Sequence, residues 1–356
     1  MNEPASNEMP KRALDEAATR AALGGWLAHE IGAKAVEVTA AALLAGGAVQ
    51  QNWRLDVAVD GGPRTGSHAW VLRTNAAATL DVSLDRIAEY RCIAAAHAAG
   101  VKVAEPIAVS QDKSLIGQPF AVQAFVAGTA QGRRIVRDPE LPGYGEALAR
   151  AIGAEMAKIH AIVPKDGVLP FLPRPLGNPA RRIVAELRDI LDKASAPRPA
   201  LEYILAWLDQ TAPEPKAITL VHGDLRTGNY MIEAGQLTAI LDWEFCHFGD
   251  PREDLGWFIA RCWRFGNDAK VAGGIGKVAS LLEGYNAGAG VPINAQELHY
   301  FEVQAAARWA AIALAQGDRF IKGGERSIEL ALTGLMPPEM ELDALDLIDR
   351  VEGKGR

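Results

Sequence analysis

The sequence predicts an α+β protein in which a small β-rich part precedes a larger, mainly helical part. Alternating apolar residues in "RLDVAVD" (54–60) are typical of a half-buried strand. Apolar residues at helical spacing run through 143–163, the pattern of a buried helix. Beyond that helix we expect strands only within 218–245. The chain has 356 residues, of which 49% are hydrophobic, so it can bury sizeable cores in both parts.

In the first part we expect a helix, a β-hairpin, a second helix and a further strand. Residues 1–12 are predicted to form a flexible tail, and 13–31 carry apolar residues on roughly one helical face. The segment 54–74 reads as two strands joined by the turn "DGGPRTG". A strand is expected over 119–130.

The second helix is predicted over 83–99. Ser83 is its candidate N-cap and Gly100 its stop signal. Beyond the hairpin and this helix, the chain becomes mostly helical from about residue 140. Proline and glycine interrupt it over 164–179, and more helices are expected to follow.

Composition and charge exclude some classes of function. The chain has 44 acidic and 37 basic residues, a net charge of −7, which disfavours a nucleic-acid partner. No apolar signal core opens the chain and no run reaches membrane-spanning length, so no membrane partner is expected. The three cysteines show no metal-type spacing. We therefore expect a soluble cytoplasmic protein with reduced thiols; its oligomeric state has no signal in the sequence.

Polar side chains follow two apolar segments of the helical part. "ITLVHGD" (218–224) and "LTAILDWE" (237–244) both read as strands that end in polar residues. Buried carboxylates need compensation by positive charge or a chemical role. The strand ends would present oxygen donors together, which favours a hard cation such as Mg²⁺ over zinc. The donors are Asp224, Asn229, Asp242 and Glu244.

The spacing of these residues is informative. Asp224 and Asn229 form D-x-x-x-x-N, the arrangement of the protein-kinase catalytic loop, with glycine in place of the usual arginine after His222. In kinases the aspartate accepts the proton of the attacking hydroxyl and the asparagine holds a metal ion. A second aspartate on the next strand, here Asp242, binds magnesium that bridges the phosphates.

The joint motif "VHGDLRTGN…ILDWEFCHFGDPREDL" resembles the aminoglycoside phosphotransferase and choline kinase family. "DLGWFIARCWRFG" is similar to its bacterial branch, whose relatives occur beside or fused to acyl-CoA dehydrogenases. The resemblance spans about 35–335, with the specific motifs in 222–255. It implies a two-lobed protein-kinase-like fold: a nucleotide-binding lobe over 13–126 and a helical lobe with the acceptor site over 127–356.

The resemblance also implies roles for individual residues. Asp224 would be the catalytic base and His222 an orienting residue. Asn229 and Asp242 would be magnesium ligands, with the neighbouring Glu244 as a further candidate ligand. Asp254, in "GDPREDL", is expected to brace the catalytic loop.

A phosphate-binding cation is expected in the first lobe. The candidate is Arg73 in "WVLRT", where most kinases of this fold carry lysine; its partner would be Glu89. The alternative is that Arg73 is a solvated strand residue and Glu89 pairs with Arg86 on the helix surface.

Backbone groups could bind the rest of the nucleotide. Gly46 and Gly47 of "AGGAVQQNW" could let amides approach phosphates, although relatives follow them with serine and asparagine, and a plain β-turn is the alternative. Gln123, Phe125 and Val126 fall where the lobes of such kinases join, so their backbone would contact adenine. They fit an ordinary buried strand end equally well.

One acidic residue of the motif has a structural interpretation. Asp250, Pro251 and Glu253 read as an N-cap, a proline at the first helical position and a capping-box glutamate.

Together these features predict an ATP-dependent phosphotransferase that moves the γ-phosphate of Mg·ATP to a hydroxyl of a small molecule. Two alternatives stay open. The arginine at the lysine position and the altered glycine turn suit a nucleotide-binding pseudokinase. A metal-dependent phosphohydrolase would use His222, Asp224, Asn229 and Asp242, but such sites want several histidines, and the chain has 7 in all.

The acceptor is not specified by the sequence. Its binding surface should come from 130–215 and 257–335. Four aromatic residues there could stack on a cationic head group or could simply belong to the core. They are Trp257, Phe258, Trp263 and Trp309.

Overall fold

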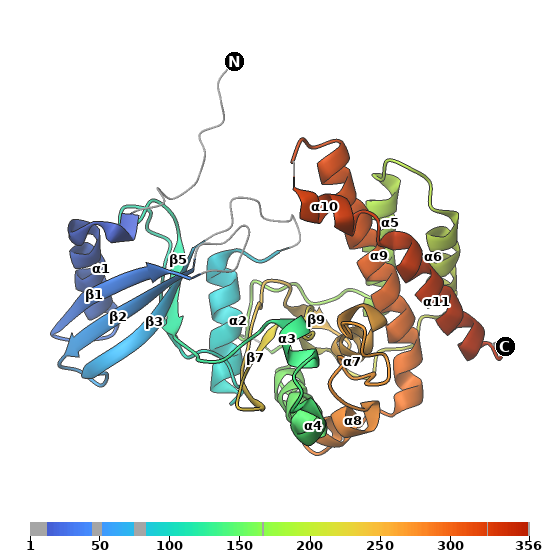
Figure 1. The fold of residues 1–356 in the computed structure, drawn as a ribbon, viewed down its shortest axis with the longest axis horizontal. Helices are drawn as coiled ribbons and strands as arrows, with labels where there is room; N and C mark the ends of the chain where they lie inside the picture. Colours follow the sequence, from blue (N-terminus) through green and yellow to red (C-terminus); the bar gives the residue numbers. More distant parts are fainter. Residues whose placement is uncertain (1–12, 45–51, 75–82, 166, 326, 355–356) are drawn as a thin grey trace. The chain divides into compact units, whose positions relative to one another are not determined.

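The computed structural model describes residues 13–44, 52–74, 83–165, 167–325 and 327–354. They divide into two compact units (Figure 1). The first unit runs to Ala127 and also contains Thr238–Cys246; the second contains Gly128–Leu237 and the chain from His247 onward.

The first unit is built on a five-stranded antiparallel sheet. Its strand order is β1-β2-β3-β5-β4. The predicted hairpin is confirmed as β2 and β3, with Leu55 opposite Trp70. Two strands, β1 and β4, were not predicted, and the strand expected over 119–130 ends at Ala124. The bounds are β1 (Ala35–Leu43), β2 (Asn52–Asp60), β3 (Gly66–Thr74), β4 (Pro106–Ser110) and β5 (Phe120–Ala124).

One helix covers the core of this sheet. The predicted first helix is present as α1 (Ala17–Glu30), preceded by the short turn η1 (Ala13–Asp15). Leu23 and Leu27 are fully buried in a core that they share with side chains of β1, β2, β3 and β5. Burial of each leucine contributes roughly 1.5–3 kcal/mol.

The second helix of this unit, α2 (Arg86–Ala98), begins later than predicted. The N-cap is Asp85, not Ser83, because the Asp85 carboxylate accepts the backbone N–H groups of Ile87 and Ala88 at 2.9 and 2.8 Å. A carboxylate there satisfies two unpaired donors and complements the helix dipole. The helix stops before Gly100, which has φ +76°, as predicted.

The second unit is mainly helical. The predicted buried helix is confirmed as α4, in which Leu148, Ile152, Met156 and Ile159 are 0–1% exposed. The elements, in order, are α3 (Gly132–Val136), α4 (Leu141–His160), α5 (Pro179–Asp192), α6 (Pro199–Thr211), α7 (Arg252–Ile259), η2 (Arg261–Trp263), α8 (Val278–Asn286), η3 (Ala295–Leu298), α9 (His299–Ile321), α10 (Ile328–Thr333) and α11 (Pro337–Val351).

Two glycines let α4 and α8 pack closely. A side chain at Gly153 would overlap the carbonyl group of Leu281, and one at Gly284 would overlap that of Arg150. The helix that carries His160 is thereby held against its neighbour along much of its length.

Short strands frame the loop that bears the predicted catalytic residues. β6 (Thr219–Val221) pairs antiparallel with β9 (His247–Gly249), and β7 (Tyr230–Glu233) follows the loop. We call residues 222–229 the Asp224 loop. β8 (Gln236–Ile240) is shorter than predicted, so Asp242 and Glu244 lie beyond its end rather than in it.

The helices and the cysteines bear on the environment of the protein. None of the helices in the described parts of the chain is long and apolar enough to cross a membrane. All three cysteines are free thiols.

Candidate functional site

The predicted site residues fall into two sets. Arg73, Glu89, Asp242 and Glu244 belong to the first unit, whereas the Asp224 loop belongs to the second. Gly46 and Gly47 lie outside the described residues.

In the first unit, Arg73 is an ion-paired residue near the end of β3. Its side chain is buried, and its Nη1 donates to Glu89 Oε1 at 3.0 Å. Its Nη2 lies 3.4 Å from Asp242 Oδ1. Burial lowers the pKa of Arg73, but the charges of Glu89, Asp242 and Glu244 outweigh that effect and raise it. The guanidinium group therefore lies among carboxylates and is not a solvated strand side chain.

Arg86 is a second buried cation beside Arg73, although it was expected only on the helix surface. It is 5% exposed and forms an ion pair with Glu89 Oε2, while its Nη2 donates to the Thr74 carbonyl at 2.9 Å. Glu89, itself 1% exposed, thus binds Arg73 and Arg86 at once. The Arg86–Glu89 pair, the alternative given for Glu89, is therefore present together with the Arg73–Glu89 pair, but it is buried and does not lie on the helix surface.

Asp242 has an unusual backbone conformation. Its φ is +58°, in the left-handed region that few non-glycine residues adopt. Such conformations persist where the surroundings impose them, and they cluster at functional sites. Its side chain is 47% exposed, so the carboxylate remains accessible to a cation beside its contact with Arg73.

Glu244 completes a cluster with an excess of negative charge. Three carboxylates (Glu89, Asp242, Glu244) face two guanidinium groups (Arg73, Arg86). Burial, and then the charges of Glu89 and Asp242, raise the pKa of Glu244 to about 6, against the opposing charges of Arg86 and Arg73. A cation bound at the exposed Asp242 carboxylate would relieve this repulsion, and carboxylate oxygens are ligands that suit a hard metal ion.

The residues expected to contact adenine also lie in the first unit. Gln123 is in β5, and Phe125 and Val126 follow it, all three partly buried. The backbone N–H of Phe125 donates to the Ala69 carbonyl at 2.9 Å, and the Arg54 guanidinium lies 4.7 Å from the centre of the Phe125 ring. The Phe125 amide is therefore engaged within the unit.

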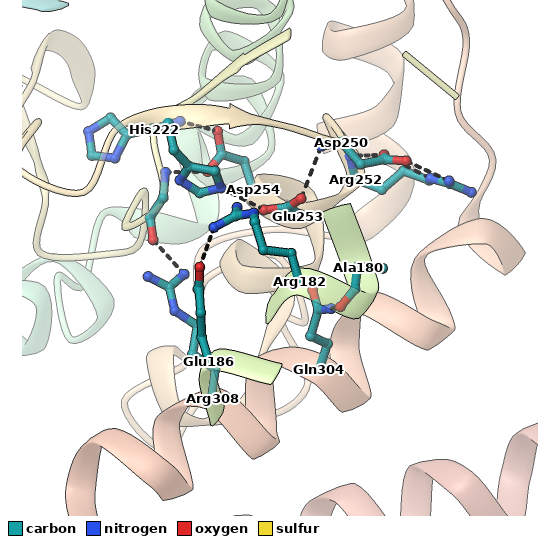
Figure 2. A network of polar contacts seen from close by, with 12 residues as sticks. Ala180, Arg182, Glu186, His222, Asp250, Arg252, Glu253, Asp254, Gln304 and Arg308 are labelled. Atoms are coloured by element: carbon teal, nitrogen blue, oxygen red, sulfur yellow. Dashed lines mark hydrogen bonds and ion pairs between the residues drawn. The ribbon is translucent and has the colours of Figure 1, made fainter. Parts of the chain in front are cut away.

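In the second unit, Asp254 holds the start of the Asp224 loop (Figure 2). This α7 carboxylate is fully buried and accepts the backbone N–H groups of His222 at 2.8 Å and Gly223 at 2.9 Å. Its Oδ2 also bonds His160 Nε2 of α4 at 3.0 Å, and His160 Nδ1 bonds the Tyr285 hydroxyl at 3.1 Å. Asp254 therefore joins three elements.

The pKa of Asp254 reflects these contacts. Burial alone would raise the pKa, but the hydrogen bond from His160, the charges of His160 and His222 and the His222 N–H together lower it to about 2. The carboxylate is therefore ionised at any physiological pH and stays available as an acceptor.

Asp224 is held from several sides. Its Oδ1 accepts the indole N–H of Trp257 at 2.9 Å, and its Oδ2 accepts Asn229 Nδ2 at 2.7 Å. Its backbone N–H donates to His222 Nδ1 at 3.2 Å, so the imidazole orients the base's own peptide group. Arg226 Nε lies 3.3 Å from Oδ1. The side chain is 15% exposed, so these contacts fix its position without enclosing it.

Asn229 is the last residue of the Asp224 loop, and only its amide nitrogen takes part in its hydrogen bonds to Asp224. Nδ2 donates both to the Asp224 carbonyl at 2.8 Å and to the Asp224 carboxylate. The amide oxygen takes no part in either bond, so it fits the role of a metal ligand. Within the described residues, no group of three or more His, Cys, Asp or Glu side chains is arranged to hold a metal ion by itself.

Sequence reasoning missed four residues that support Asp224 or the backbone of its loop. They are His160, Arg226, Trp257 and Arg308, and three of them come from other helices. Arg308 Nη1 of α9 donates to the Gly223 carbonyl at 2.7 Å, and its guanidinium lies 4.7 Å from the centre of a Trp257 ring. Only Arg226 lies inside the motif.

The aromatic residues considered for a cationic head group belong to the core. Trp257, Phe258 and Trp263 are 3%, 0% and 7% exposed. Trp263 packs against Trp309 and carries the Arg226 guanidinium 4.4 Å from a ring centre. Arg308 lies over a Trp257 ring and Arg226 over a Trp263 ring, so the protein's own cations already stack on these two residues.

Asp250 has a structural role at the start of α7, as the sequence indicated, but the helix begins one residue later than predicted. α7 begins at Arg252, with Pro251 as its N-cap rather than its first residue. The Asp250 carboxylate accepts the Arg252 N–H at 2.9 Å, and the Glu253 carboxylate accepts the Asp250 N–H at 3.0 Å. Asp250 also binds the Arg252 guanidinium.

Comparison with known proteins identifies a family and relatives that match large parts of this chain. The model of the phosphotransferase enzyme family matches residues 40–291. Acyl-CoA dehydrogenase family member 10 of Mus musculus is 30% identical over 194 residues, 52% of this chain and 18% of the relative. Family member 11 of Rattus norvegicus is 26% identical over 284 residues, 75% of this chain and 36% of the relative. The chain therefore spans only a minor part of the length of these relatives.

Solved structures share the fold. A Ralstonia eutropha protein described as a candidate aminoglycoside phosphotransferase is 22% identical with a TM-score of 0.73, covering 92% of this chain and 98% of that one. Spectinomycin phosphotransferase bound to ADP and spectinomycin is 13% identical with a TM-score of 0.57, covering 92% and 97%. The predicted α+β, protein-kinase-like fold class and the family resemblance are confirmed.

The raised pKa of Glu244 predicts a pH dependence of stability. A carboxyl with a pKa of about 6 when folded and 4.5 otherwise binds more protons in the native state, so the free energy of unfolding falls as pH rises through that window. Glu244→Gln should remove this decline, which chemical denaturation across the window measures. Glu37→Gln, at an exposed position of β1, is the matched control. A decline that persists unchanged in Glu244→Gln would contradict the assignment.

Proposed function

Because the chain belongs to the phosphotransferase enzyme family, we propose that it transfers the γ-phosphoryl group of ATP to a hydroxyl group of a small molecule. The observation that carries this proposal is the Asp224 carboxylate, which Trp257 and Asn229 hold in place while it stays partly exposed. A fixed, accessible carboxylate at this position of the motif suits the orientation of an attacking hydroxyl.

In this proposal Asp224 is the catalytic base. It accepts a hydrogen bond from the acceptor hydroxyl and takes its proton as the bond to phosphorus forms. His222 and Asp254 act as positioning residues, because they fix the backbone of the Asp224 loop and do not reach the reacting atoms. Most of the rate enhancement then comes from positioning and charge compensation, as in other phosphoryl transfers.

Arg226 is a further candidate for the reacting centre. Its side chain is 27% exposed, lies beside Asp224 and is stacked on Trp263. A guanidinium fixed in this way can compensate the charge that spreads over the equatorial oxygens of the transferred group. We propose that Arg226 contacts the γ-phosphoryl group.

The nucleotide is assigned to the residues of the first unit, and the metal to Asp242 together with Asn229 of the Asp224 loop. Magnesium would be held by the Asn229 amide oxygen and the Asp242 carboxylate, with Glu244 nearby in sequence, and Arg73 would bind phosphate oxygens. When bound, the ion neutralises charge on the β- and γ-phosphates. We assign nucleotide binding to 13–126 and acceptor binding to 127–356. The free thiols favour a reducing compartment such as the cytoplasm.

The pseudokinase alternative rests on the arginine at the lysine position and on the altered glycine turn, which lies outside the described residues. In the structure, Arg73 has the ion pair with Glu89 that the active arrangement requires of the lysine. Arginine stays charged and forks to two phosphate oxygens, so the substitution is compatible with phosphate binding. We therefore favour catalysis.

Substitution of the base provides the first test. Asp224→Ala should lower acceptor-dependent ADP release by about 10²–10⁴-fold, because general-base and positioning contributions are lost together. Nucleotide affinity, measured by calorimetry, should stay close to that of the unmodified protein. Asp209→Ala, at an exposed aspartate of α6, is the control. Normal turnover in Asp224→Ala would refute the base assignment, and ADP release that needs no acceptor would favour a hydrolase.

The indole of Trp257 should act through Asp224. Trp257→Phe removes the N–H donor but keeps an aromatic ring, so kcat should fall by about 10–100-fold while KM for ATP stays unchanged. Trp309→Phe is a matched control, since the Trp309 N–H has no hydrogen-bond partner among the described residues. Steady-state kinetics on both variants checks this. Equal losses in the two variants would mean that Trp257 serves packing alone.

A further inference from the structure

An open cavity of about 880 Å³ lies at the start of the second unit, and its lining contains none of the individual site residues named so far. Its size is within the range of ligand sites, roughly 300–1,000 Å³. One side is formed by α3 and the turn after it, and the other by Ile232 of β7 and the turn at Ala234 and Gly235. Figure 1 labels α3 and β7, which both belong to the second unit.

Three arginines line this cavity: Arg133, Arg134 and Arg137. All three are exposed, and none has a carboxylate within ion-pairing distance among the described residues. Most other arginines of the second unit form such pairs, for example Arg198 with Glu341 and Arg261 with Asp343. A concentration of unpaired guanidinium groups stands out in a chain with a net charge of −7.

The backbone beneath these arginines is fixed. Ile135 and Val136 are buried, and a side chain at Gly132 would come within 2.5 Å of the Phe265 ring. Just before α3, Thr129 exchanges two backbone hydrogen bonds with Ile232, at 2.9 and 3.0 Å. These hydrogen bonds hold the two sides of the cavity together. The backbone that carries the arginines therefore needs little ordering when a ligand binds.

The acidic residues of the lining offset the charge of the arginines only in part, and Asp138 attracts Arg134 electrostatically. Asp138 Oδ2 accepts the Tyr144 hydroxyl at 2.7 Å, and Oδ1 accepts the Glu140 N–H at 2.9 Å, so both oxygens are engaged within the turn. Glu140 is the other acid. With three arginines and two carboxylates, the lining has a net charge of +1.

The cavity wall also approaches the Asp224 loop. A side chain at Gly228, between Asp224 and Asn229, would lie 3.9 Å from the carbonyl oxygen of Ala130. Ala130 is three residues before Arg133. The loop that carries the proposed base and the segment that carries the arginines thus pack together within one unit.

From these contacts we propose that the cavity is a subsite for an anionic group of the acceptor, a phosphate or a carboxylate, held by Arg133, Arg134 and Arg137. This inference rests on the proposed function for the identity of the ligand as the acceptor. Guanidinium groups bind both kinds of anion through paired hydrogen bonds. The acceptor would then be an anionic hydroxy compound and not a polycation.

The test is calorimetric titration with inorganic pyrophosphate and, separately, with malonate, at low ionic strength. The variant is Arg133→Gln/Arg134→Gln/Arg137→Gln. The control is Arg150→Gln/Arg181→Gln/Arg188→Gln, which removes the same charge from α4 and α5. Arg73 is unchanged in all three proteins, so any anion bound there cancels in the comparison.

We expect the α3 variant to bind at least one of the two anions about tenfold more weakly than the unmodified protein and the control, a loss of about 1.4 kcal/mol. Whether pyrophosphate, malonate or both show the loss identifies the kind of anion. Equal binding by all three proteins, or no binding by the unmodified protein at about 10 mM, would overturn the proposal. Neither titration needs turnover, so failure here is distinguishable from failure of Asp224→Ala to abolish ADP release.

Discussion

The buried carboxylate of Asp254 is the constraint on which the second unit's site depends. A fully buried charge is tolerated only when hydrogen bonds and opposite charges compensate its desolvation. Asp254 meets that requirement through His160 and the first two amides of the Asp224 loop. The same bonds fix where the loop starts. Removing any one partner leaves a buried charge less compensated, so the loop geometry and the stability of this region are coupled.

The first unit also contains a buried carboxylate, but there two arginines compensate its charge. Glu89 is almost completely buried and binds two guanidinium groups, one from β3 and one from its own helix. The Asp242 segment faces the same cluster, with Asp242 in a left-handed conformation and Glu244 holding its proton more tightly than usual. The strained residue and the surplus negative charge both lie where we propose the metal ion, whose positive charge would compensate the carboxylates.

The sequence predicted the parts of this arrangement that depend on local pattern. The β2–β3 hairpin, α4 and the spacing of Asp224 and Asn229 follow from periodicity or motif. The N-cap of α2 is Asp85, whereas the sequence pattern indicated Ser83. Both residue types can cap a helix, and the two lie within three positions of each other. Other features depend on contacts between residues far apart in the chain, such as the Trp257 N–H on Asp224 and the membership of 238–246 in the first unit. No local pattern contains these contacts.

The most direct test of the proposed reaction is to follow the γ-phosphoryl group itself. ATP carrying ¹⁸O in its γ-phosphoryl group would be incubated with the protein, magnesium and a panel of hydroxyl compounds, and the products identified by mass spectrometry. We expect a phosphomonoester of one acceptor that retains the three labelled non-bridging oxygens, since the P–O bond to the β-phosphate breaks, ADP leaves and the acceptor oxygen takes its place. Labelled inorganic phosphate as the sole product, with or without acceptors, would contradict it.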